Sequence, residues 1–223
     1  MQNPLLLAVF VLALFLFGIF NIVSRAFYKR RHGDKYSFRK MFPYEFNYPS
    51  VFKENPYGNF LFIFASLTII VFYVLNPFNS SMYRIMSLVA SIAFTMVLIC
   101  LIMMPLYYLK THMALSCIAM VLSLVLPLFN LFLALEQRKV ATSQAQDILC
   151  IVSMIVSGIL SFTMMVLILN PRLTFKIYLD KTVDTEGKEV FIRPKVIFLA
   201  LNEWMSIFIY FLSPLAVLLI SLI

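Results

Sequence analysis

The sequence predicts an all-α polytopic membrane protein with six transmembrane helices, and three observations support this fold class. Hydrophobic residues make up 62% of the 223-residue chain and charged residues 13%, against about 45–50% and about 25% in soluble domains. The apolar residues are gathered into six long runs. Most Lys and Arg residues lie in connections that would share one side of the membrane. We therefore expect a single membrane domain over residues 1–223.

The six apolar runs have the length of membrane-spanning helices. An α-helix needs roughly 20 residues to cross about 30 Å of hydrocarbon. Transmembrane strands would alternate in polarity, whereas these runs are apolar on all sides. We expect the spans at about 4–24, 59–76, 85–109, 113–135, 148–169 and 198–223.

The first run predicts an uncleaved helix whose N-terminus lies outside. No Lys or Arg precedes it, and Arg25, Lys29, Arg30 and Arg31 follow it. A cleaved signal peptide carries its positive charge before the apolar stretch, so the order here favours a membrane anchor.

The distribution of basic residues predicts the orientation of the whole chain. Lys and Arg are concentrated in cytoplasmic connections of membrane proteins. With six spans, one side receives residues 25–58, Lys110 and residues 170–195, and these hold 15 of the 18 Lys and Arg residues. We therefore expect an N-out/C-out protein of the cell membrane, with cytoplasmic segments 25–58 and 170–195.

The first cytoplasmic segment joins a basic cluster to aromatic residues at alternate positions from Phe42 to Tyr48. Pro43 and Pro49 disfavour a helix, and an extended chain would align the rings on one face. This composition is typical of contact with anionic lipid headgroups. Nucleic acid is not expected, because lipid phosphates already supply the counter-charge. We predict contacts with membrane lipids or a partner protein for Arg30, Arg31, Arg39, Lys40, Phe42, Tyr44, Phe46 and Tyr48.

The second cytoplasmic segment predicts a small β-hairpin between the fifth and sixth helices. Apolar and polar residues alternate over 174–183, which is the period of a strand. Asp184 to Gly187 suits a four-residue turn before a second strand at 188–193. Two strands alone are marginally stable in water, so the hairpin needs a third strand, the membrane surface or another protein to cover its apolar face. We hypothesise that residues 42–48 supply the third strand.

Few polar residues interrupt the spans, and each is a candidate functional residue because ionisable groups are costly inside a membrane. We expect Glu203 near the inner interface, with its carboxylate reaching the headgroups. We expect His112 in a solvated loop between the third and fourth spans. The candidate polar site residues are Asn130, Ser157, Asn202, Glu203 and His112.

Small hydroxyl residues recur at helical spacing in two spans. They are Ser87, Ser91 and Thr95 in the third span and Ser153, Ser157 and Ser161 in the fifth. Small side chains allow helices to approach closely. The pattern predicts that both spans are internal.

The sequence contains no HExxH, GxSxG or glycine-rich phosphate motif, and its three cysteines have no metal-like spacing. We expect no catalytic, cofactor or metal site. The favoured hypothesis is a non-enzymatic subunit or accessory of a membrane complex, which docks a partner on its basic, aromatic face. The alternative is a small-solute transporter or channel subunit, although the lack of charge at mid-membrane argues against coupling to protons or cations.

Overall fold

The computed structural model describes residues 4–47, 51–78, 80–103, 109–173, 180–183, 189–192 and 194–222. Within these ranges, six helices are long and apolar enough to cross a membrane, which confirms the predicted number of spans. The helical elements are α1 (Pro4–His32), η1 (Pro43–Asn47), α2 (Val51–Glu54), α3 (Pro56–Val74), α4 (Met82–Met103), α5 (Leu109–Lys139), α6 (Gln144–Ile168), α7 (Phe198–Leu212) and α8 (Pro214–Ser221).

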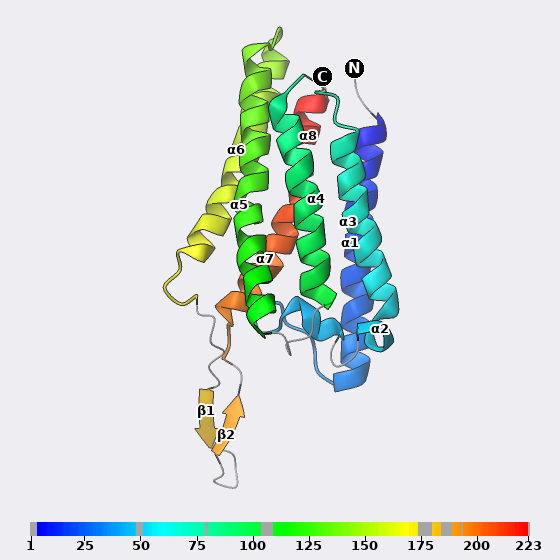
Figure 1. Cartoon of the computed structure of the whole chain (residues 1–223), viewed down its shortest axis with the longest axis vertical. Coiled ribbons are helices and arrows are strands. Elements are labelled where there is room, and N and C mark those ends of the chain that lie inside the picture. Colours follow the sequence, from blue (N-terminus) through cyan, green and yellow to red (C-terminus); the bar gives the residue numbers. More distant parts are fainter. Residues whose placement is uncertain are drawn as a thin grey trace.

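The long helices run side by side along one axis (Figure 1). The beginning of α1 and the end of α8 lie together at one end of this bundle. The short helices η1 and α2 and a pair of strands lie at the opposite end, which we call the hairpin end.

The pair α7 and α8 forms the centre of the bundle. Among the six spans in the described chain, the one formed by these two helices is the most enclosed, and it contacts α1, α3, α4, α5 and α6. The helix divides at Pro214, which has no backbone N–H to continue the hydrogen-bond ladder.

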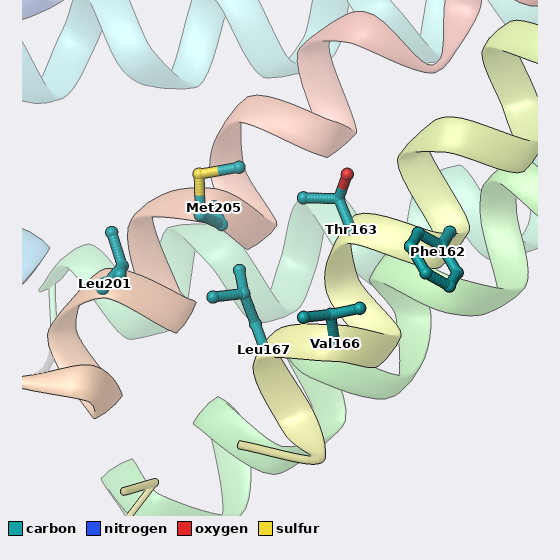
Figure 2. Close-up of a pocket in the computed structure, with 6 residues that line it drawn as sticks. All are labelled: Phe162, Thr163, Val166, Leu167, Leu201 and Met205. Carbon is teal, nitrogen blue, oxygen red and sulfur yellow. The ribbon is translucent and has the colours of Figure 1, made fainter.

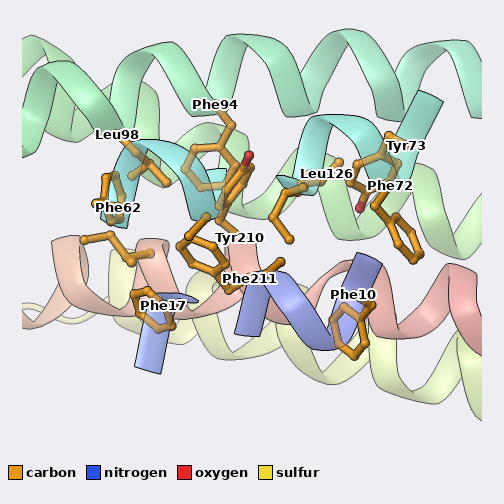
Figure 3. Close-up of a cluster of buried hydrophobic side chains, with 14 of the residues drawn as sticks. Phe10, Phe17, Phe62, Phe72, Tyr73, Phe94, Leu98, Leu126, Tyr210 and Phe211 are labelled. Atoms are coloured by element: carbon orange, nitrogen blue, oxygen red, sulfur yellow. The ribbon is translucent and has the colours of Figure 1, made fainter. Parts of the chain in front are cut away.

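Aromatic rings fill the space between α7 and its neighbours (Figure 3). Phe17 of α1 and Phe211 of α7 are stacked, with ring centroids 4.1 Å apart. Phe94 of α4 meets Tyr210 edge to face at 5.0 Å. Because lipid tails are as apolar as these side chains, such close packing, rather than escape from water, holds the helices together.

The serine pattern predicts α4 and α6 as internal helices, and for α6 this is wrong. Its span is the least enclosed of the six in the described residues. Only the face with Ser153, Ser157 and Ser161 is buried. Ser153 donates a hydrogen bond of 2.7 Å to the carbonyl of Ala216 in α8. The small residues therefore pack one side of α6 against the bundle, and its other side stays exposed.

The first helix extends eight residues past its expected end. Its basic last turns, which include Lys29, stay helical until Gly33. Gly33 has a φ of +76°, which is the left-handed conformation that commonly ends a helix. Its N–H donates to the carbonyl of Lys29 at 2.9 Å.

The strands β1 (Asp180–Val183) and β2 (Glu189–Ile192) pair antiparallel, with Asp180 opposite Ile192. Residues 174–179, 184–188 and 193, which belong to the predicted hairpin, lie outside the described residues. The sheet has two strands in the part of the chain that is described. The predicted third strand at 42–48 is wrong, because residues 43–47 form the 3-10 helix η1.

Candidate functional site

Residues 36–47 form a compact cap on the hairpin end of α7, and we call them the cap segment. The indole N–H of Trp204 is shared between the Tyr36 hydroxyl and the carbonyl of Met41, both at 3.0 Å. The Tyr36 hydroxyl in turn donates to the carbonyl of Phe42 at 2.7 Å. Burial raises the pKa of Tyr36 well above its usual value, and the Glu45 carboxylate adds to this, so the phenol keeps its proton and can donate.

Arg31, near the end of α1, binds the cap segment through its guanidinium group. Its guanidinium lies 2.6 Å from the carboxylate of Glu54 and donates to the carbonyl of Phe46 at 3.2 Å. The amide of Asn47 donates to the carbonyl of Ile102 at the end of α4 at 2.9 Å. Together with the Trp204 bonds, the bonds of Phe46 and Asn47 tie the cap segment to α1, α4 and α7.

The aromatic residues predicted to form an exposed contact surface are instead covered by the protein itself. Phe42, Tyr44 and Phe46 are buried, because the 3-10 turn directs them inward rather than along one face of an extended chain. Tyr48 lies outside the described residues. Among the predicted basic contacts, Arg30 and Arg39 are exposed, whereas Lys40 is half-buried and Arg31 is engaged with Glu54.

Beneath the cap segment lies a buried pair of titratable side chains. His112 Nε2, from the first turn of α5, is 3.1 Å from Glu203 Oε1 of α7. The edges of Tyr44 and Phe42 meet the His112 ring at centroid distances of 5.1 and 6.2 Å. His112 is 1% exposed and Glu203 0%.

Ser116 completes this buried cluster. Its hydroxyl lies 2.6 Å from Glu203 Oε1 and 2.9 Å from the carbonyl of His112, so one proton has two acceptors. A nucleophilic serine would need its hydroxyl on the histidine ring. Here the hydroxyl bonds the carboxylate and the backbone, so the geometry is not that of a hydrolase triad.

Neither titratable side chain has the solvated surroundings that we expected from the sequence. His112 does not lie in a loop, because α5 already begins at Leu109. The Glu203 carboxylate is buried and turns toward α5 instead of outward. The missed signal was the four-residue spacing of His112 and Ser116, which puts both on one face of a helix.

Four polar atoms of this region are buried without a hydrogen-bond partner among the described residues. They are His112 Nδ1, Glu203 Oε2, Asn202 Oδ1 and Ser206 Oγ. Asn202, Glu203 and Ser206 share one side of α7 by helical spacing. Buried polar groups normally have partners, so a cluster of unpaired ones calls for an explanation. We call His112, Ser116, Asn202, Glu203 and Ser206 the polar site.

Asn130, another predicted site residue, belongs to a separate cluster. Its amide donates to the hydroxyl of Tyr73 at 2.9 Å and to the carbonyl of Ser213 at 3.0 Å, and its oxygen accepts from Ser87 at 2.9 Å. It lies 18 residues along α5 from His112, which is roughly 27 Å. All its polar atoms are paired, so Asn130 joins helices and does not belong to the polar site.

Ser157, the remaining predicted residue, is buried on α6. Its hydroxyl has no partner among the described residues. No contact joins it to the polar site within those residues. The polar site has no group of three or more metal-binding side chains in the part of the chain that was described.

The fold and the apolar helices define the class of protein as a multi-pass membrane protein with six candidate spans. Comparison with family models, with curated proteins and with solved structures finds no match to this chain.

Proposed function

We propose that this protein is a subunit of a small-solute transporter or channel, and that the polar site binds and releases a proton during its cycle. The observation that supports this most is the buried pair of His112 and Glu203, whose two titratable side chains share a hydrogen bond inside the bundle. Ionisable residues at such positions are costly and commonly mark the path of an ion or a proton. The pair therefore weakens the expectation, drawn from the sequence, of a mechanism without proton coupling.

The unpaired atoms around the pair support the same proposal. Among the described residues, His112 Nδ1 and Glu203 Oε2 have no hydrogen-bond partner, so each could hold a proton, a water molecule or a polar solute. The cap segment covers the pair on the hairpin end through Phe42 and Tyr44. We propose that the cap segment moves when a proton or solute passes to that side.

We also propose that the hairpin end faces the cytoplasm of a cell membrane, with both termini outside. The concentration of 15 of the 18 Lys and Arg residues in the connections at that end supports this orientation.

Proton flux into reconstituted vesicles tests the function. Vesicles that hold a pH-sensitive dye acidify when a pH gradient is imposed, and wild-type protein should make them acidify faster than protein-free vesicles. Glu203→Gln should lower the flux at least tenfold, since the amide cannot exchange a proton with His112. Asp34→Asn is the matched control, because it removes an exposed carboxylate and should leave the flux unchanged. Two results would reject the proposal. One is a proton flux into wild-type vesicles that does not exceed the flux into protein-free vesicles, and the other is an unchanged flux with a folded Glu203→Gln protein.

A second candidate function is that of an accessory subunit of a membrane complex. It is favoured by the strand pair β1 and β2, which extends from the bundle (Figure 1). Among the described residues each strand pairs only with the other, so each leaves one edge open to a partner strand. Purification in mild detergent tests this function. A stoichiometric companion that is lost when residues 180–192 are replaced by a short glycine-serine linker would support it, and a solitary monomer would reject it.

A further inference from the structure

An apolar groove lies between α6 and α7 on the outside of the bundle, close to the hairpin end. It has a volume of about 340 Å³. Figure 2 shows its two walls, with Leu201 and Met205 on α7 facing the residues of α6. The lining residues are Phe162, Thr163, Val166, Leu167, Leu201 and Met205.

The groove exists because α6 packs on α5 and α8 and its carboxyl end leans away from the bundle (Figure 1). Its walls offer almost no polar atom to a ligand. The one hydroxyl, that of Thr163, donates to the carbonyl of Ile159 in its own helix at 2.8 Å. Phe162 and Val166 are exposed, as residues are that face lipid tails. The groove therefore suits a hydrocarbon chain.

Two exposed cations lie within two residues of side chains that pack with the groove lining, since Leu173 and Ile197 share a hydrophobic cluster with Leu167 and Met205. Arg172 follows α6 by four residues, and Lys195 precedes α7 by three. Neither forms an ion pair with another described residue. Within residues 160–173 and 194–205 the one acid is Glu203, which is turned toward His112. In these two segments the two cations are therefore not matched by an exposed acid.

We propose that this groove is a binding site for one anionic phospholipid. An acyl chain lies between α6 and α7, and the phosphate is held by Arg172 and Lys195. The charge of the two cations selects an anionic headgroup over a zwitterionic one, because each basic residue near such a headgroup favours binding by about fivefold. The site does not use Glu203, so it does not depend on the proposed proton function.

Native mass spectrometry of the delipidated protein, titrated with phosphatidylglycerol or phosphatidylcholine, tests the site. The wild-type protein should retain one phosphatidylglycerol at concentrations where it retains no phosphatidylcholine. The double substitution of Arg172→Gln and Lys195→Gln should weaken phosphatidylglycerol binding roughly 25-fold. The matched control is Lys29→Gln with Lys35→Gln, which removes two exposed cations from the same end of the bundle, away from the groove.

A second substitution tests the acyl chain separately from the headgroup. Val166→Trp fills the groove from a position that is 48% exposed, so the fold should tolerate it, as circular dichroism would show. It should weaken the binding of both lipids. Two results would overturn the proposal: equal binding by the Arg172 and Lys195 variant and its control, or unchanged phosphatidylglycerol binding by Val166→Trp.

Discussion

Gly58, in the first turn of α3, lies against Ser24 of α1 and against Asn55. A Cβ atom at this position would overlap with the Asn55 side chain and the Ser24 hydroxyl. These two residues are joined by a hydrogen bond of 2.8 Å, so neither can move aside without losing it. The absence of a side chain at Gly58 is therefore what allows the two helices to pack.

We predict that Gly58→Ala lowers the free energy of unfolding by about 1–3 kcal/mol, which is the usual cost of overpacking. Gly158→Ala is the control, because a Cβ at Gly158 meets no atom within 4 Å. It should be neutral or slightly stabilising. Unfolding by a denaturing detergent would measure both, and equal stability of the two variants would contradict the role of Gly58.

The Asn130 side chain connects α3, α4 and α5 to the junction between α7 and α8. We predict that Asn130→Ala lowers stability by about 2 kcal/mol, because three interhelical hydrogen bonds of about 0.6 kcal/mol each are lost. Ser87→Ala removes one of them and should cost about 0.6 kcal/mol. The same unfolding assay measures the difference, and a smaller loss for Asn130→Ala than for Ser87→Ala would contradict the network.

At the scale of elements, the cap segment depends on Trp204. We predict that Trp204→Phe increases hydrogen exchange at residues 38–46 roughly tenfold, because the shared N–H bond to Tyr36 and Met41 contributes about 1.4 kcal/mol to keeping the cap closed. Mass spectrometry of peptides from the exchanged protein measures this. Phe162→Leu, on the exposed face of α6, should leave the same peptides unchanged.

The sequence predicts the spans well because span length depends on local composition. It does not predict the cap segment, since Pro43 and the alternating rings fit an extended chain as well as a 3-10 turn. The pairing of His112 with Glu203 joins residues 91 positions apart. Only tertiary packing brings them together, so a pattern within one helix could not reveal it.

At the scale of the whole molecule, the proposed orientation predicts which lysines are reachable from outside. We predict that a membrane-impermeant amine reagent, added to sealed cells, modifies Lys139 and spares Lys35 and Lys195. All three are exposed, so accessibility within the protein does not separate them. Peptide mapping reads the result, and permeabilised cells supply the control in which all three react. Labelling of Lys35 in sealed cells would show that the orientation is the reverse of the proposed one.

The central position of α7 and α8 has a consequence for biogenesis. These helices follow the other five spans in the sequence, yet they supply the carboxylate that meets His112 and the carbonyl that meets Asn130. During translation the earlier spans are therefore made before His112 has its carboxylate partner and before Asn130 has its third hydrogen bond. The centre of the bundle is filled only when α7 and α8 enter it, so we expect a nascent chain stalled before α7 to be recognised by membrane chaperones and quality-control proteases.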